Sequence, residues 1–220
     1  MEKKTTKRKT KKATAKTSAA LLQKIVVLPG EMLFSEVDGK PSVSAVMSAV
    51  DSGDSILLMI EKESENGEKP DENGTINKNV YEIGIIARVR QVIKVSDKLA
   101  RALFEGVSRT KILNITEKKT TFNVEVAALT QEDMGTYTPE ENEAMCRNMA
   151  SSVQEFLRVN PRVSKSFVNK MKRNAAIVEL IDFVASNLPI EFENKLMVLQ
   201  ISNIMERYMY LMGVLENECN

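Results

Sequence analysis

The stretch from Tyr81 to Ile115 constrains the fold of this chain more than any other feature, because apolar and polar residues alternate along it. The alternation breaks once, at 96–98 (Ser-Asp-Lys), and then resumes. A period near two with many β-branched residues predicts two antiparallel strands that share one buried face. We expect that face to carry Ile83, Ile85, Ala87, Val89, Val92, Leu99, Leu103, Val107 and Ile112.

Two glycines, Gly84 and Gly106, interrupt these predicted strands. A glycine inside a strand is typical of a bulge or of a close approach by another backbone segment. We therefore expect the sheet to bend, or to be crowded, at both positions.

The flanking sequence adds further short elements to this sheet. Strands are expected at 23–28 (QKIVVL), 55–60 (SILLMI) and 121–129 (TFNVEVAAL), and a helix capped by Ser42 is expected through Val50. Residues 62–79 are polar and aperiodic, which predicts a long loop. Together these segments predict a compact, partly closed antiparallel β-domain of about six strands with one helix on one side.

Beyond Thr138 the apolar period changes from two to 3.6. The sequence 138–141 (Thr-Pro-Glu-Glu) has a capping hydroxyl, a proline at the first helical position and a glutamate at the third, which predicts a helix start. Further apolar stripes predict an all-α bundle, so the fold class is α+β. We divide the chain into a tail (1–20), a β-domain (21–130) and a helical bundle (136–220).

The tail is basic although the whole chain has a net charge of only +1. Residues 2–17 carry eight Lys and Arg side chains against Glu2, and no apolar pattern accompanies them. Such a composition cannot bury enough surface to offset its ordering entropy, so we expect a disordered, solvated segment. A salt-dependent contact with nucleic acid or another polyanion remains an alternative.

Residues that support common catalytic chemistry are scarce. The chain has no histidine, and its two cysteines, Cys146 and Cys219, lack metal-ligand spacing. No glycine-rich phosphate loop and no Gly-x-Ser-x-Gly motif is present. We predict no enzymatic activity for this chain by itself, no metal and no cofactor. Two unpaired cysteines and the lack of an apolar run of about 18 residues favour a cytoplasmic location.

Arginines recur along the predicted central strands, with Glu82 and Glu105 interspersed among them. A purely basic face would suggest nucleic-acid binding, whereas alternating charges favour cross-strand ion pairs on a solvated exterior. The arginines are Arg88, Arg90, Arg101 and Arg109.

The sequence of the central stretch resembles two motifs of a known protein family. Residues 81–89 (YEIGIIARV) resemble the YxxGxxAxI strand of the amino-terminal, substrate-binding domain of Lon-type ATP-dependent proteases, and 104–112 (FEGVSRTKI) resemble that family's VEGxxRxxI motif. Residues 27–29 (VLP) and 32–34 (MLF) resemble two motifs near the start of the same domain. The resemblance covers about residues 24–218.

This resemblance implies a PUA-like β-domain followed by a helical bundle. It also implies a role in capturing unfolded or degron-bearing proteins for ATP-dependent proteolysis by a Lon-type ATPase-protease, whose ATPase and Ser–Lys protease domains are expected outside this chain. Capture of exposed apolar segments requires accessible apolar side chains. The candidates for substrate contact are therefore Met32, Leu33 and Phe34, unless this trio is simply core. A groove between the β and α parts is a second candidate, since ligand sites favour domain junctions.

Six residues carry the family motifs, and we expect them to shape the sheet rather than to touch a substrate. They are Gly84, Ala87, Arg88, Glu105, Gly106 and Arg109. Two other functions stay open from the sequence: nucleic-acid binding by a PUA-like fold with a basic tail, and small-molecule sensing by the β-domain. Clients, oligomeric state and whether the chain is a stand-alone protein or a piece of a protease are open as well.

Overall fold

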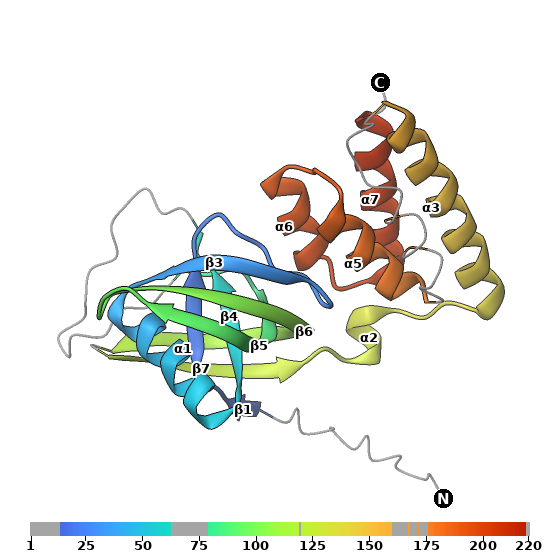
Figure 1. The fold of residues 1–220 in the computed structure, drawn as a ribbon. Helices are drawn as coiled ribbons and strands as arrows, with labels where there is room; N and C mark the ends of the chain where they lie inside the picture. Colours follow the sequence, from blue (N-terminus) through green and yellow to red (C-terminus); the bar gives the residue numbers. More distant parts are fainter. Residues whose placement is uncertain are drawn as a thin grey trace, which may run out of the picture.

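The computed structural model describes residues 14–62, 79–118, 120–159, 167, 171 and 176–218. A β-sheet unit comes first, and a helical unit lies at one end of it (Figure 1). The predicted fold class, an α+β chain with a helical part after the sheet, is confirmed.

The first unit is one seven-stranded sheet in the order β1-β7-β6-β5-β4-β2, with β3 paired to β6 off that path. All paired strands are antiparallel except β2 and β4, which are parallel. The strands are β1 (Thr14–Lys16), β2 (Ala19–Leu22), β3 (Met32–Asp38), β4 (Ser55–Ile60), β5 (Ile83–Lys94), β6 (Leu99–Lys118) and β7 (Thr121–Ala128).

The long strand β6 organises the sheet. One of its edges pairs with β5 along most of its length, and the other edge pairs first with β3 and then with β7. Strand β2 contacts both β3 and β7, so the sheet curls into a partly closed barrel-like shape. The central pair therefore holds together strands that are distant in the sequence, as the alternating stretch predicts.

Helix α1 (Lys40–Ser52) packs against β2, β5, β6 and β7. Its buried residues include Val43 and Val46, as expected, but Gly39 rather than Ser42 occupies the N-cap. Ser42 lies inside the helix, and its hydroxyl accepts a hydrogen bond from the Leu21 backbone N–H at 3.1 Å. The expected capping role is thus wrong, because the hydroxyl joins the helix to β2 instead.

The first part of the chain departs from the sequence prediction in two ways. The predicted strand at 23–28 is irregular, because Lys24 takes a left-handed φ of 52° that ends the extended run. The regular strand in this region is instead β2, which precedes the predicted one. Its Ala19 and Ala20 are buried beside β4. The expected disorder of 1–20 is therefore wrong for β1 and β2, while residues 1–13 lie outside the described residues.

The inward face of β6 also differs from the prediction. Ala100, Ala102 and Phe104 are fully buried, whereas Leu103 is half-buried and Val107 is exposed. Small alanines allow the neighbouring layer to approach closely, and Phe104 fills the remaining space. A register shift opposite Ile86 and Ala87 then leaves Val107 unpaired, so that the buried face continues at Thr110 and Ile112.

The second unit is helical and follows the predicted stripes. Thr138 and Glu141 form the expected capping box, with hydrogen bonds of 2.7 and 3.2 Å, at the start of α3. An unpredicted short helix, α2, links the units with a capping box of its own. The helices are α2 (Gln131–Met134), α3 (Pro139–Val159), α5 (Ile177–Asn187), α6 (Phe192–Gln200) and α7 (Ile204–Asn217).

Two predicted segments are mostly outside the described residues. The loop at 62–79 is described only at its ends, where Glu61 and Val80 form an antiparallel bridge. The short helix expected at 164–171 is described only at Phe167 and Met171, which are both buried.

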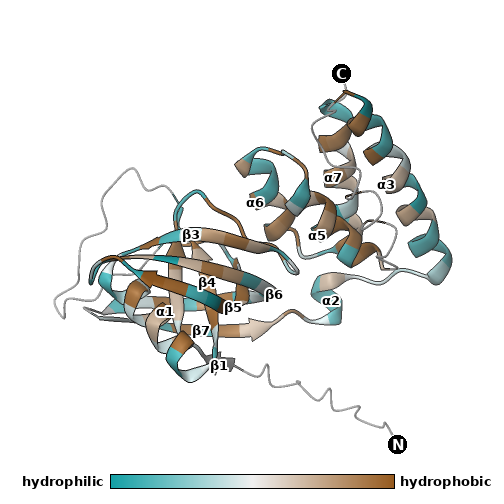
Figure 2. Ribbon diagram, in the orientation of Figure 1, coloured by the Kyte–Doolittle hydropathy of each residue, from teal (hydrophilic) through white to brown (hydrophobic). Residues whose placement is uncertain are grey.

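One continuous apolar core runs from the sheet into the helical unit, and apolar residues mark β4, β5 and α5 in Figure 2. Three polar links cross the same junction. Arg109 of β6 pairs with Asp182 of α5, and Lys195 of α6 contacts Glu31 at 2.6 Å. The Gln200 side-chain amide bonds both backbone groups of Ile83, at 2.9 and 2.8 Å. These links fix α5 and α6 against the sheet.

Candidate functional site

Strand β3 presents the apolar trio singled out by the sequence. Met32 and Phe34 are each 57% exposed, whereas Leu33 between them is half-buried and packs against the core. Alternation along a strand explains this division, because successive side chains point to opposite faces. The structure therefore places two of the three candidate residues on one accessible face and gives Leu33 a supporting position.

A cavity of about 520 Å³ lies beside this face. Phe34 lines it together with Leu21 and Ile25, from the segment that precedes β3. Its lining also includes Glu36 and Arg101, which form an ion pair at 2.8 Å. The exposed apolar side chains thus border a hollow with a charged margin.

Strand β3 is also an edge strand in the described part of the sheet. It pairs with β6 along one side, from Met32 opposite Glu105 to Asp38 opposite Leu99, and forms no ladder with another described strand. An edge strand offers backbone donors and acceptors to an extended segment. Apolar side chains and a strand edge that forms no second ladder among the described strands therefore occur together at Met32 and Phe34, with β2 nearby.

Both glycines of the family motifs lie where another backbone segment approaches closely. A Cβ atom at Gly106 would lie 2.1 Å from the carbonyl oxygen of Leu28, and one at Gly84 would lie 2.9 Å from the carbonyl oxygen of Leu58. Gly106 also exchanges backbone hydrogen bonds of 2.9 Å with Gly30 and Glu31. The turn that carries the 27–29 motif is thereby held against β6, immediately before β3.

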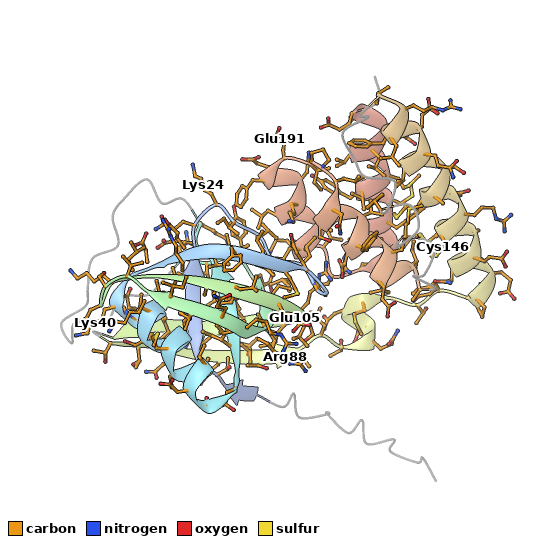
Figure 3. All side chains as sticks on the ribbon, viewed as in Figure 1. Lys24, Lys40, Arg88, Glu105, Cys146 and Glu191 are labelled. Carbon is orange, nitrogen blue, oxygen red and sulfur yellow. The ribbon has the colours of Figure 1, made fainter. Side chains whose placement is uncertain are left out.

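Ala87 and the charged motif residues divide between interior and surface. Ala87 is fully buried opposite Gly106. Arg88 and Arg90 lie on the outer face beside Glu105, with Arg90 in hydrogen-bonding contact and Arg88 at 4.0 Å; Figure 3 labels Arg88 and Glu105 on this part of the sheet. The cross-strand, ion-paired exterior expected for these arginines is present.

Arg109 has a role that sequence reasoning missed. It does not shape the sheet but forms a bidentate ion pair with Asp182, and it also donates to the backbone carbonyls of Val198 and Leu199 at 3.3 and 3.4 Å. The signal that could have revealed this is Asp182 itself, an acidic residue inside the otherwise apolar stripe of α5.

The junction between the units contains the largest of the described cavities, about 1130 Å³. Its walls come from the 29–30 turn, β6, the α2 region, α5 and α7. Arg207 of α7 lines it and was not singled out by the sequence analysis. Burial and, to a lesser degree, the nearby Arg109 guanidinium lower the pKa of Arg207 to about 10, against an opposing effect of the Asp182 carboxylate.

Other chemistry is limited in the described part of the chain. No group of three or more acidic or cysteine side chains there could hold a metal ion. Cys146, labelled on α3 in Figure 3, is a half-buried free thiol, and burial raises its pKa. No described helix combines the length and apolar character needed to cross a bilayer.

Comparison with known proteins matches these features to one family. A family model described as the ATP-dependent protease La (LON) substrate-binding domain matches residues 19–217. The N-terminal domain of the Lon protease of the Mycobacterium avium complex has the same fold, with a TM-score of 0.71 and 16% identity, covering 92% of this chain and 99% of that one. The Lon N-terminal domain protein from Xanthomonas campestris gives a TM-score of 0.55 at 15% identity, covering 90% of this chain and 98% of that one.

Curated relatives are complete Lon proteases, of which this chain matches one part. The Lon protease of Brevibacillus choshinensis is 30% identical over 90% of this chain, and that of Haemophilus influenzae is 26% identical over 95%. The match spans about a quarter of each relative, 24% and 25%. With a family model that covers nearly the whole described fold, the chain belongs to the Lon substrate-binding domain family.

Proposed function

We propose that this chain is a substrate-recognition module that binds unfolded or degron-bearing polypeptides for ATP-dependent proteolysis. The observation that carries the proposal is the pair Met32 and Phe34, both exposed on one face of an edge strand beside a cavity. Membership of a substrate-binding domain family supports it. The proposal requires only binding from this chain. Its partner would be a Lon-type ATPase-protease.

The arrangement suits an unfolded client for two physical reasons. Unfolded chains expose apolar side chains, whose transfer onto Met32 and Phe34 removes apolar surface from water. They also expose backbone N–H and C=O groups, which can pair with the outer edge of β3. A folded protein satisfies its backbone groups internally and hides its apolar residues, so it offers neither.

The test is a binding titration with a permanently unfolded, fluorescently labelled polypeptide, reduced and carboxymethylated α-lactalbumin. Replacing Met32→Ser and Phe34→Ser together should weaken binding about tenfold or more, since two apolar contacts are lost. The matched control replaces Ile93→Ser and Val95→Ser, which are comparably exposed on the β5–β6 hairpin. Equal losses in the two double variants would overturn the assignment of the site to β3.

A further inference from the structure

The cavity between the sheet and the helical unit combines apolar walls with one incompletely neutralised cation. Its apolar lining includes Leu129, Met134, Tyr137, Phe183 and Ile204. Its volume of about 1130 Å³ lies just above the range of typical ligand sites, which is roughly 300–1,000 Å³. The cavity is therefore large enough to hold several apolar side chains of a ligand.

Arg207 supplies the cation. It is only 2% exposed, and its guanidinium donates to the backbone carbonyls of Ile201 and Ser202 at 2.8 and 3.0 Å. Among the described residues no carboxylate forms an ion pair with it, because both oxygens of the nearby Asp182 bond Arg109. The direct hydrogen bonds of the Arg207 guanidinium thus go to neutral carbonyls, and the Asp182 carboxylate that attracts it is shared with Arg109. A buried cation in this position favours an approaching anion.

The surroundings define the kind of anion. The buried group comprises two guanidinium groups and one carboxylate, an excess of one positive charge. Glu179, an exposed acidic residue in the cavity lining, would repel a second negative charge on a ligand. Apolar walls disfavour a small, fully hydrated ion. These features favour a single carboxylate attached to an apolar body.

We propose that this cavity binds the C-terminal carboxylate of a polypeptide whose last residues are apolar, with Arg207 as the contact for the carboxylate. The inference rests on the proposed function, because the occupant is a client polypeptide. The 29–30 turn supports a polypeptide over a small acid: it lines the cavity and precedes Met32 of β3 by two residues. A chain bound along the exposed face of β3 thus has the cavity next to it.

The experiment measures binding of a fluorescein-labelled peptide ending in Ala-Leu-Phe, as the free acid and as the C-terminal amide. The free acid should bind about tenfold more tightly, because only it forms the charge-assisted contact. Arg207→Gln should remove this difference, and Arg88→Gln, an arginine on the outer face of β5, should retain it. Equal affinity of the two peptides, or an acid preference that survives Arg207→Gln, would overturn the proposal.

If circular dichroism shows that Arg207→Gln does not fold, a second variant provides the test. Ser108 is exposed and lines the cavity, so Ser108→Trp should fill it without touching the charges and weaken the free acid about tenfold. Unchanged binding of the free-acid peptide to this variant would contradict the location of the site.

Two further ligands separate the possible outcomes. If sodium octanoate binds and the free-acid peptide does not, the ligand is not a polypeptide and the proposal is contradicted. Unfolded α-lactalbumin bound with no acid preference would overturn this inference alone, whereas no binding of any polypeptide would overturn the proposed function.

Discussion

Arg109 of β6 and Asp182 of α5 form a bidentate ion pair across the junction of the two units, with nitrogen–oxygen distances of 2.5 and 2.6 Å. Their side chains are 5% and 4% exposed. A buried charge that loses its partner is left without compensation, so the pair makes the docking of α5 on the sheet sensitive to either residue. The motif arginine of the family thus holds the helical unit in place.

Asp182→Ala should therefore lower the free energy of unfolding by about 3–5 kcal/mol, because the Arg109 charge stays buried near Arg207. Urea unfolding followed by circular dichroism measures the change. Replacing both partners, Arg109→Met with Asp182→Leu, should recover most of the loss. The exposed pair of Arg101 and Glu36 provides the control: Arg101→Met should cost less than about 1 kcal/mol. A double variant as unstable as Asp182→Ala would contradict this account.

Gly106→Ala should destabilise the chain severely. The added Cβ would lie 2.1 Å from the Leu28 carbonyl oxygen, so the turn that precedes β3 must move away from β6. We expect the free energy of unfolding, measured by urea or heat, to fall by about 3 kcal/mol or more, at or above the top of the usual range for overpacking, because the clash is with a backbone atom. Gly213→Ala in α7 is the matched control, since nothing lies within 4 Å of its added Cβ, and it should stabilise by up to about 1 kcal/mol. Similar effects of the two substitutions would argue against close approach as the cause.

The Cys146 thiol should react slowly at neutral pH. Burial raises its pKa, so at a given pH it has less thiolate than an ordinary cysteine, and only the thiolate is nucleophilic. In a Cys219→Ser background, the rate of iodoacetamide alkylation should rise with pH to a midpoint above that of free cysteine. Guanidinium unfolding should bring the midpoint back to the ordinary value. A midpoint at or below that of free cysteine in the folded protein would contradict the prediction.

Polyanion binding by the basic amino-terminal segment stays a prediction. Deletion of residues 1–13 tests it without removing Ala19 and Ala20, which are buried in the sheet. Filter binding of nucleic acid should be weak, fall steeply with salt and disappear on deletion, because the contact would be purely electrostatic. Tight binding that survives the deletion would assign the contact to the folded part instead.

Local sequence patterns predicted those helices and strands whose structure depends mainly on neighbouring residues in the sequence. Strand alternation located β5 and β6, and the capping sequence at Thr138 located the start of α3. Local patterns did not place the face of β6, since the shift near Val107 depends on packing by Phe104 and on the Leu28 turn. For the same reason the strand at Ala19 was missed: its alanines are buried only because the strand pairs with β4, and their own sequence shows no strand pattern.

The candidate site divides in the same way. The trio at Met32 was visible as a short apolar run, but its split into two exposed residues and one half-buried residue required the register of β3 on β6. A groove at the junction was a general expectation, but its lining was not predictable, because Arg207, Asp182 and the 29–30 turn meet there from distant parts of the chain. Residues that act through long-range packing leave no local pattern to detect.

The most direct test of the central claim is methyl NMR of the methionine side chains during titration with unfolded α-lactalbumin. Met32 and Met209 are both exposed, at 57% and 62%, and Met149 is fully buried. Met209 belongs to α7, which lies apart from β3 in Figure 1. If β3 binds clients, the Met32 methyl signal should shift or broaden while those of Met209 and Met149 stay unchanged. A Met32 signal that does not respond, or a Met209 signal that responds equally, would contradict recognition at β3.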